Sequence, residues 1–408
     1  MKNIFIIITL LFALLPNVKG QSIDHKKIKE DLDEIINDIA GNYVYLQEKE
    51  IDLGLLRKRY EDLIPNIKNK QDAILFFEYL IDEFYDSHLI LHTNTPSSYR
   101  LFSPIYLSLK SGRPIITQIW KTQLENPDNG LIGAQLVKVN GTSVGSVIKG
   151  FPTQVQNKNN PQIKEWIINK IIAGRYDQPR LLTLKTPNNR IIEFDLDKLK
   201  IKSETELLTA KLINGVGVIR INDSLGENRL ISAFDACLDT LMNTKGLILD
   251  LRNTVSGGNT YVARGIMGRF IDTPGPYQIH RFTEQYDDQP PVERLWAEYT
   301  SPRGLKYTKP VVVLVGRWTG SMGEGLTIGL DGMGCVKVVG TEMERLAGEV
   351  SGFSFKHNTY GFQLSTAKLL HVNGTPREKF VPKYYIKQTA SNRDEALEKG
   401  MELIRKIK

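Results

Sequence analysis

The sequence is poor in the residues that build metal sites and disulfide-stabilised folds. Only two cysteines, Cys237 and Cys335, and six histidines occur among its 408 residues. No Cys/His spacing is typical of zinc binding. Each cysteine lies in an apolar segment, which favours two buried thiols, although a disulfide stays open as an alternative in an oxidising compartment. The sequence therefore predicts neither a zinc site nor a disulfide-stapled scaffold.

Long hydrophobic runs are absent outside residues 1–20. This segment begins with a lysine near its start, continues with the apolar run 4–15, and ends in Pro16 and small residues at 18–20. The pattern is typical of a secretory signal peptide that is cleaved before Gln21. The run is short for a membrane span, and an uncleaved N-terminal anchor is the alternative. We expect a secreted or periplasmic protein without a stable membrane span after cleavage.

The sequence also lacks blocks of one charge sign, long repeats and low-complexity tracts. Its formal net charge is +7, but basic residues alternate with acidic ones. Such interspersed charges are typical of a solvated surface and do not form a nucleic-acid footprint. The length exceeds one ordinary core and predicts two or three domains.

The pattern of apolar residues divides the exported chain into three parts. Residues 21–97 show helical spacing and end in Ser87-His88 before a short strand at 89–91. Residues 98–200 contain short strands, a tight turn at Asn140-Gly141 and one helix at 163–173. Residues 201–408 alternate strands and helices, with a strand at 216–221, a hairpin at 350–370 and an amphipathic helix at 392–408. Residues 271–309 are rich in prolines, aromatics and charges, and we expect an irregular excursion there.

The most informative stretch is KPVVVLVGRWTGSMGEGLTIGL at 309–330. Val311 to Val315 is a continuous β-branched run that predicts a strand buried on both faces. A glycine-containing turn follows, and Ser321 opens a helical segment. The helix N-terminus offers free N–H groups and a dipole that favour developing negative charge, so Ser321 is a candidate nucleophile. A serine there is also a good N-cap, which is the structural alternative.

Three segments carry a resemblance to a known family: GLILDLRNTVSGGNT at 246–260, KPVVVLVGRWTGSMGEG at 309–325 and NGTPREKFVP at 373–382. They resemble the S41 peptidases, which include the tail-specific or C-terminal processing proteases and the tricorn-protease core. The resemblance implies an α/β multidomain fold with a ClpP/crotonase-like ββα spiral core, an N-terminal helical domain and a PDZ-like domain. It implies a serine peptidase without a cofactor that acts on peptides or proteins.

The resemblance also implies site residues. One branch of the family uses a lysine as the base, but the nearest residue here is Arg345, whose guanidinium stays protonated. The other branch uses a histidine from the N-terminal region and a glutamate after the serine. Ser87-His88 and Glu378 match that arrangement, with His88 as general base and Glu378 orienting the imidazole directly or through Ser87.

The oxyanion would be held by backbone N–H groups of Met322 and of Gly257 or Gly258, where the absence of a Cβ permits close approach.

Several alternatives stay open at this level. His280, His357 and His371 are other candidate bases if the N-terminal region packs elsewhere. Asp250 and Arg252 are expected to form a structural ion pair at a strand end, and Glu324 to support the first helical turn through the dipole. Two other functions compete with catalysis: a ligand carrier on the same fold, similar to the retinoid-binding proteins, and a scaffold that docks peptides on the PDZ-like domain.

Overall fold

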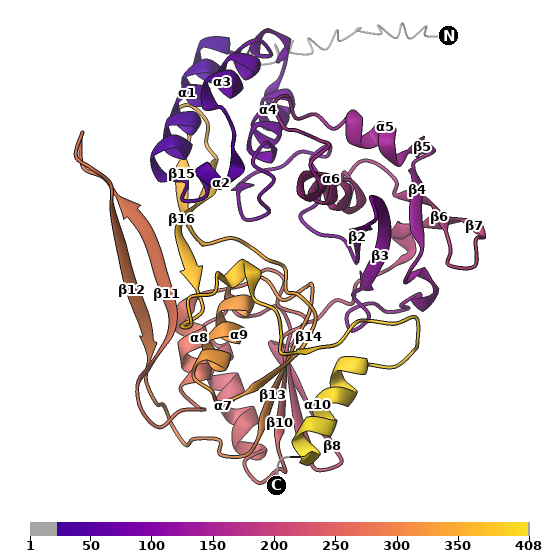
Figure 1. Cartoon of the computed structure of the whole chain (residues 1–408), viewed down its shortest axis with the longest axis vertical. Coiled ribbons are helices and arrows are strands. Elements are labelled where there is room, and N and C mark those ends of the chain that lie inside the picture. Colours follow the sequence, from indigo (N-terminus) through magenta and orange to yellow (C-terminus); the bar gives the residue numbers. More distant parts are fainter. Residues whose placement is uncertain (1–22, 407–408) are drawn as a thin grey trace, which may run out of the picture.

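The computed structural model describes residues 23–406, which form a mixed α/β multidomain structure (Figure 1). The expected signal peptide lies outside these residues. Within them, no helix combines the length and the apolar character needed to cross a bilayer. Cys237 and Cys335 are both free thiols, so no disulfide joins them.

A six-stranded sheet in the order β17-β14-β13-β10-β9-β8 forms the centre of the C-terminal half. All neighbours are parallel except β8 and β9. The strands are β8 (Leu208–Ile213), β9 (Val216–Ile221), β10 (Leu247–Asp250), β13 (Val311–Val315), β14 (Lys337–Gly340) and β17 (Tyr384–Tyr385). Helices α7 (Leu230–Thr240), α8 (Thr260–Met267) and α9 (Met322–Gly332) accompany them, and α10 (Glu395–Lys406) closes the chain.

Strand β13 is buried along its whole length, as its apolar run predicts. Val311, Val313 and Val315 pack in the cluster that contains α7, α8 and α9. Val312 and Leu314 point to the other face, where they meet Leu403 and Ile404 of α10. The strand is apolar at every position because helices cover both faces of the sheet.

The N-terminal helices are α1 (His25–Asn42), α2 (Leu46–Lys49), α3 (Leu53–Glu61) and α4 (Lys70–Asp82), with a 3-10 turn at Ile64–Asn66. They share one hydrophobic cluster with the hairpin of β15 (Glu349–Ser354) and β16 (Gly361–Leu370). Strand β1 (Ile90–Leu91) pairs with β16 in the sheet order β1-β16-β11-β12, in which β11 is Gly275–Glu284 and β12 is Val292–Thr300. The N-terminal segment is therefore attached to a hairpin that comes from the C-terminal third of the chain.

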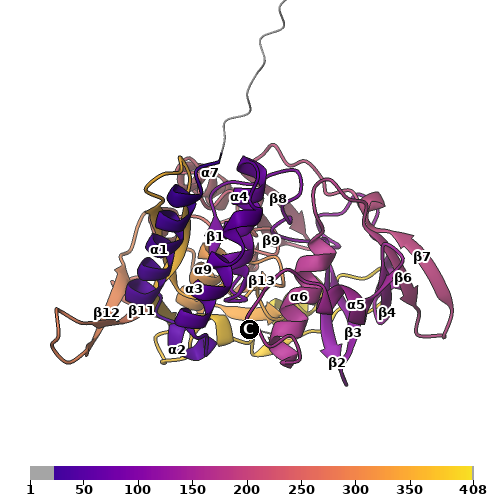
Figure 2. The same ribbon diagram turned by 90° about the horizontal axis from the view of Figure 1, so that it is seen from above.

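Residues between these two parts build a third sheet in the order β2-β3-β4-β6-β7, with β5 beside β4. The elements are β2 (Ile105–Lys110), β3 (Arg113–Ile119), β4 (Gln135–Val139), β5 (Thr142–Ser143), α5 (Val144–Lys149), α6 (Pro161–Ala173), β6 (Leu181–Lys185) and β7 (Ile191–Asp195), with 3-10 turns at Asn129–Leu131 and Leu196–Lys198. This β2–β7 unit lies beside the N-terminal helices (Figures 1 and 2).

The expectation of an irregular excursion at 271–309 is wrong. The segment contains two long antiparallel strands, β11 (Gly275–Glu284) and β12 (Val292–Thr300), which extend from the body as a ribbon (Figure 1). Residues 292–297 of β12 are all exposed, including Leu295 and Trp296. The strand therefore carries no alternation between a buried and a solvated face, which is the signal by which strands are recognised in a sequence.

Two stacked indoles fix the β2–β7 unit against the central sheet. The rings of Trp120 and Trp318 are parallel with centroids 5.3 Å apart. Trp120 Nε1 donates to the carbonyl of Arg252 at 2.9 Å, and Trp318 Nε1 donates to the carbonyl of Ser103 at 2.9 Å. Because Trp318 lies in the turn after β13, this contact connects the β2–β7 unit to the segment that carries Ser321.

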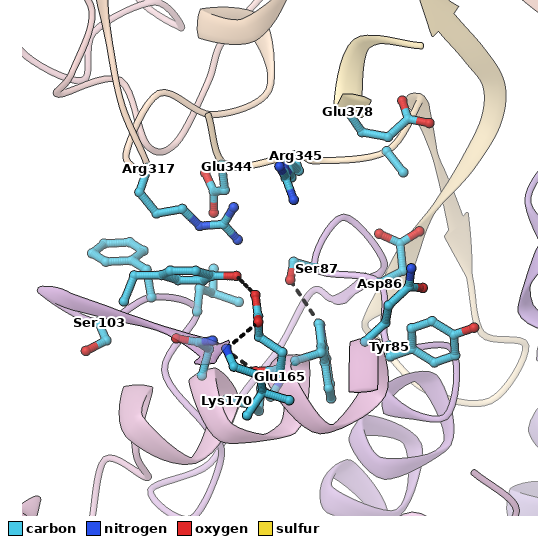
Figure 3. Close-up of a pocket in the computed structure, with 18 of the residues that line it drawn as sticks. Tyr85, Asp86, Ser87, Ser103, Glu165, Lys170, Arg317, Glu344, Arg345 and Glu378 are labelled. Carbon is cyan, nitrogen blue, oxygen red and sulfur yellow. Dashed lines mark hydrogen bonds between the residues drawn. The ribbon is translucent and has the colours of Figure 1, made fainter. Parts of the chain in front are cut away.

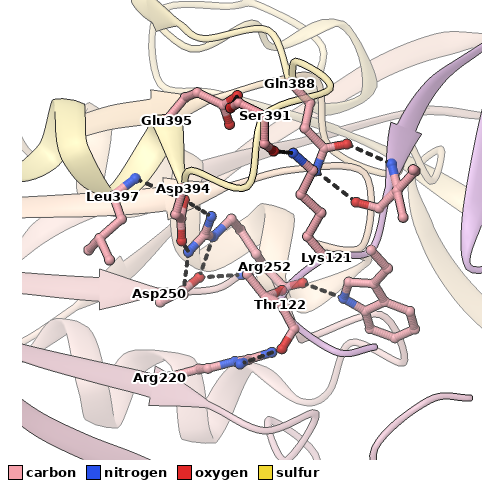
Figure 4. A network of polar contacts seen from close by, with 12 residues as sticks. Lys121, Thr122, Arg220, Asp250, Arg252, Gln388, Ser391, Asp394, Glu395 and Leu397 are labelled. Atoms are coloured by element: carbon pink, nitrogen blue, oxygen red, sulfur yellow. Dashed lines mark hydrogen bonds and ion pairs between the residues drawn. The ribbon is translucent and has the colours of Figure 1, made fainter. Parts of the chain in front are cut away.

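Arg252 is the centre of a buried ion-pair network at the end of β10 (Figure 4). Its guanidinium binds both oxygens of Asp250 at 2.8 Å and both oxygens of Asp394 at 2.7 and 2.9 Å. Asp394 also accepts the N–H of Leu397 at 3.1 Å in the first turn of α10. The network confirms the expected structural pair and attaches the last helix to the sheet.

We expect Arg252→Leu to destabilise the protein, because Asp250 and Asp394 would lose the cation that compensates their burial. Breaking a buried ion pair costs about 3–5 kcal/mol, and the partial exposure of Asp394 places the expected loss near the lower end. Urea unfolding followed by circular dichroism measures this change. Arg229→Leu, whose side chain is 81% exposed, is the control and should change the unfolding free energy by less than about 0.5 kcal/mol. Equal losses in both variants would contradict the expectation.

Candidate active site

Ser321 occupies a strained turn between β13 and α9. Its φ of 46° and ψ of −111° are rare for a residue with a side chain. The turn at 316–321 lies against the loop after β10, because Thr254 N donates to the carbonyl of Trp318 and Gly320 N donates to the carbonyl of Thr254, both at 3.1 Å. The two loops that follow neighbouring parallel strands thus meet around the serine.

His88 reaches this turn through the pairing of β1 with β16. Ile90 and Leu91 pair with Gln363 and Phe362, so the residues just before β1 are held beside the C-terminal hairpin. Gln363 Nε2 also donates to the carbonyl of His88 at 2.9 Å. The position of the imidazole is therefore fixed by a strand from a distant part of the sequence.

Ser321 and His88 face each other, with Ser321 Oγ 3.3 Å from His88 Nε2. The other ring nitrogen, Nδ1, lies 2.8 Å from the carbonyl oxygen of Ala347. Because a carbonyl only accepts hydrogen bonds, Nδ1 carries the proton and Nε2 presents its lone pair to the hydroxyl. This tautomer is the one that a base for Ser321 requires.

The surroundings of His88 keep the imidazole neutral. Its side chain is 4% exposed, and burial together with the nearby Arg377 guanidinium lowers its pKa to about 4. Asp86 opposes this shift, but its carboxylate also accepts the N–H of His88 at 2.9 Å and the hydroxyl of Tyr43 at 2.7 Å. The ring is thus a proton acceptor over the whole neutral pH range.

Glu324 connects Ser321 to the segment that holds His88. Its buried carboxylate accepts the N–H of Ser321 at 3.1 Å, of Arg345 at 2.8 Å and of Leu346 at 3.1 Å. The next residue, Ala347, supplies the carbonyl for His88. The spacing Ser-x-x-Glu is the signature of a capping box, so the bond to Ser321 could be foreseen from the sequence, but the bonds to 345–346 could not.

Gly257 lies directly against Ser321. Its φ is +69°, and a Cβ there would stand 2.4 Å from Ser321 Cβ and 3.1 Å from Met322 N, so only glycine fits. Its own N–H donates to the carbonyl of Thr254 at 3.1 Å. Among the described residues, the N–H groups of Gly258 and Met322 make no backbone hydrogen bond. Of the expected oxyanion donors, Gly258 and Met322 are therefore the ones with free N–H groups.

The structure does not bring Glu378 into hydrogen-bond contact with His88, contrary to the expected direct or Ser87-mediated bond. Ala347 occupies Nδ1, and Ser87 Oγ instead accepts a hydrogen bond from Trp166 Nε1 at 3.1 Å. Glu378 lies in the 3-10 turn Arg377–Lys379, and its Oε2 is buried without a partner. Burial raises the pKa of its carboxyl. An orienting role for Glu378 stays a prediction.

The three alternative histidines have other partners. His280 lies 2.8 Å from Glu349 and 3.2 Å from Glu298, His357 lies 2.6 Å from Glu30, and His371 lies 3.3 Å from Asp331. Only His88 contacts Ser321 among the histidines of residues 23–406. The same part of the chain contains no group of three or more metal-ligating side chains placed to hold an ion.

A cavity of about 700 Å³ is lined by sequence neighbours of both residues: Ser87 next to His88, and Arg317 and Trp318 in the turn that leads to Ser321. Neither His88 nor Ser321 is itself among the lining residues. The cavity extends between the N-terminal helices, the β2–β7 unit and the segment 344–347, and Ser87, Ala347 and Glu378 line it (Figure 3). Polar and aromatic side chains of all three parts face the space. The cavity is large enough for several residues of an extended peptide, within the usual range of ligand pockets.

Comparison with protein-family models matches residues 215–384 to peptidase family S41 and residues 24–82 to the tricorn protease C1 domain. Residues 215–384 form an S41 peptidase domain. The match covers both loops around Ser321 as well as Glu378. The tricorn-type match covers α1 to α4, the helices that pack beside β1 and precede His88.

Solved structures share the fold of this chain over nearly its whole length. Mature CPAF is 14% identical with a TM-score of 0.62, and the alignment covers 94% of this chain and 96% of that one. The photosystem II D1 C-terminal processing protease is 15% identical with a TM-score of 0.55, with 93% and 96% covered. A search of curated proteins gives no match. By its family domain, the chain is a serine-type peptidase.

The low pKa of His88 predicts that acylation of Ser321 persists in mild acid. A base with a pKa near 4 is neutral above that pH and loses its lone pair as the pH falls through it. We expect the decline in the rate of fluorophosphonate labelling that occurs at the lowest pH to have a midpoint well below the ordinary histidine value of about 6.5. Burial also raises the pKa of Glu324 to about 7, so its protonation can change the labelling rate as well. The Glu324→Gln variant lacks this titration, and its labelling is therefore measured alongside the wild type. The lowered pKa of His88 would be contradicted if the lowest pH midpoint of labelling were at or above 6.5 in both the wild type and Glu324→Gln.

Glu324→Gln should slow acylation at least tenfold, because an amide loses the charge and turns a donor toward backbone N–H groups. We expect Glu324→Ala to slow it further. The measurement is the labelling rate at pH 8 together with the thermal unfolding midpoint. Glu402→Gln, on the surface of α10, is the control and should label at the wild-type rate. Normal labelling of Glu324→Gln would show that the three hydrogen bonds do not position the site.

Proposed function

We propose that this protein is an exported serine peptidase that hydrolyses peptide bonds through an acyl-enzyme on Ser321, with His88 as the general base. The observation that carries the proposal is the distance of 3.3 Å between Ser321 Oγ and His88 Nε2, with the tautomer fixed by Ala347. The S41 domain match and the resemblance of residues 1–20 to a signal peptide support the family and the export.

The geometry supports a simple sequence of steps. Ser321 Oγ attacks the carbonyl carbon of the scissile bond while His88 Nε2 accepts its proton. The oxyanion meets the N–H of Met322 at the N-terminus of α9, where the helix dipole also favours it, and the N–H of Gly258 from the loop after β10. His88 then returns the proton to the leaving amine, and a water activated by the same imidazole hydrolyses the ester.

In this proposal, the carbonyl of Ala347 holds the ring and stabilises the imidazolium through its dipole. Ser87 and Glu378 line the same cavity and are candidates for a second orienting group. We further propose that the central sheet with its helices is a ClpP/crotonase-like core and that the β2–β7 unit is a PDZ-like domain.

The scaffold alternative is less well supported by the β2–β7 unit. The backbone N–H and carbonyl of Leu107 on β2 bind the side-chain amide of Asn169 at 3.0 and 2.8 Å, and Leu109 N donates to Glu165 at 2.7 Å. Helix α6 therefore already occupies the edge of β2 on which a peptide strand would add. The carrier alternative leaves the contact between Ser321 and His88 unexplained.

A fluorophosphonate probe separates the enzyme from both alternatives. Wild type should be labelled at Ser321, Ser321→Ala should not be labelled, and His88→Ala should be labelled orders of magnitude more slowly. Intact-mass spectrometry measures the adduct, and circular dichroism checks the fold of each variant. His371→Ala, which removes a histidine outside the site, should be labelled at the wild-type rate. A folded wild-type protein that stays unlabelled would favour the carrier.

A further inference from the structure

One wall of the cavity carries two guanidinium groups close to the nucleophile turn. Arg317 comes from the turn after β13, and Arg345 from the segment after β14; Figure 3 shows both side chains reaching into the space. Arg317 stacks over the ring of Tyr106 at 3.9 Å and donates to the carbonyl of Met343 at 2.9 Å. Among the described residues it has no carboxylate partner.

The backbone of Arg345 is fixed by a hydrogen bond, whereas its guanidinium is accessible to a bound molecule. Its N–H binds Glu324 at 2.8 Å, and its φ of 67° turns the chain at this point. The guanidinium is 46% exposed, and its ion pair with Glu342 spans 3.4 Å. An exposed pair of this kind contributes little and is easily exchanged for another carboxylate.

Glu344 lies between the two arginines in the same wall (Figure 3). Its Oε2 is buried without a hydrogen-bond partner. The carboxyl stands against the nucleophile turn, because a Cβ on Gly320 would lie 2.1 Å from Oε2. A polar atom left unsatisfied beside the catalytic serine indicates that a bound molecule supplies the missing partner.

The carboxyl of Glu344 is in the neutral form that can donate a hydrogen bond to an anion. Burial raises the pKa of its carboxyl to about 8, and the negative charge of Glu324 adds to this shift. Arg317 opposes it, and Asp223 contributes in the same direction as Glu324. At neutral pH the carboxyl is therefore protonated and donates a hydrogen bond.

Two acidic groups of the cavity, Glu165 and Asp86, are already engaged within the protein. Glu165 accepts the hydroxyl of Tyr106 at 2.8 Å and the N–H of Leu109 at 2.7 Å. Asp86 accepts the hydroxyl of Tyr43 and the N–H of His88. Glu378 Oε2 also has no partner in this cavity, but it comes from the 3-10 turn at 377–379 and not from the wall that carries Arg317, Glu344 and Arg345.

We propose that Arg317, Arg345 and Glu344 form a subsite for a substrate carboxylate, so that the enzyme prefers peptides with a carboxylate near the scissile bond. The inference rests on the proposed peptidase function and adds its substrate class. An acidic side chain and the C-terminus of a peptide offer the same chemical group, and planar guanidinium groups bind either one with two parallel hydrogen bonds.

The test compares four synthetic peptide libraries. Two carry Glu where the other two carry Gln, and each pair is made with a free C-terminus and with a C-terminal amide. Cleavage at pH 7 is followed by mass spectrometry and normalised to the amount of enzyme that fluorophosphonate labels. We expect at least about tenfold faster cleavage of a library with the preferred carboxylate, since a hydrogen bond to a charged group contributes about that much.

The variants Arg345→Gln and Arg317→Gln should reduce this ratio toward one, and Arg294→Gln on the ribbon should leave it unchanged. Arg345 is exposed, so its variant tests the subsite even if Arg317→Gln folds poorly. A preference that follows Glu or one that follows the free C-terminus identifies the source of the carboxylate, and either supports the subsite.

Two results would overturn the subsite while leaving the peptidase intact: equal cleavage of all four libraries by labelled enzyme, or a preference that both arginine variants retain. A protein that neither labels at Ser321 nor cleaves any library would instead overturn the peptidase function, and the subsite with it.

Discussion

The site depends on the hydrogen bond between His88 Nδ1 and the carbonyl of Ala347. It joins residues 259 positions apart in the sequence and exists because β1 adds to β16. The pairing covers only two residues, so it cannot be stable alone. Its stability comes from the hydrophobic cluster that α1 and α4 share with the β15–β16 hairpin, around buried side chains such as Phe77 and Phe362. Packing of the N-terminal helices thus determines where the imidazole lies.

Glu324 determines the position of Ser321 in a similar way. A fully buried carboxylate is costly unless its oxygens are hydrogen-bonded, and here three backbone N–H groups satisfy it. Those groups belong to the start of α9 and to the segment that leads to Ala347. The serine and the acceptor of His88 therefore keep a fixed separation, although they come from different loops. The carboxylate of Glu324 thus connects the start of α9 to the segment that leads to Ala347.

The sequence was informative where local pattern determines structure. Val311–Val315, the turn and Ser321 could be placed because an apolar run buried on both faces and a Ser-x-x-Glu start are local features. Strand β12 could not, because exposure on both sides removes periodicity. The resemblance implies Glu378 as the partner of His88, but in the structure a main-chain carbonyl binds the ring, and such a contact has no signature in side-chain identity. Sequence motifs do not predict contacts that backbone atoms make between segments far apart in the chain.

Burial acts on the titratable groups of the site in opposite directions, and both directions serve the proposed chemistry. It disfavours the charged form, so it lowers the pKa of His88 to about 4 and raises that of Glu344 to about 8. Near pH 7 the imidazole is therefore a neutral acceptor beside Ser321, and the carboxyl is a neutral donor. The arginines remain charged because guanidinium groups do not lose their protons in this range. A cavity with this distribution of donors complements an anion without adding a second base that would compete for the proton of the serine.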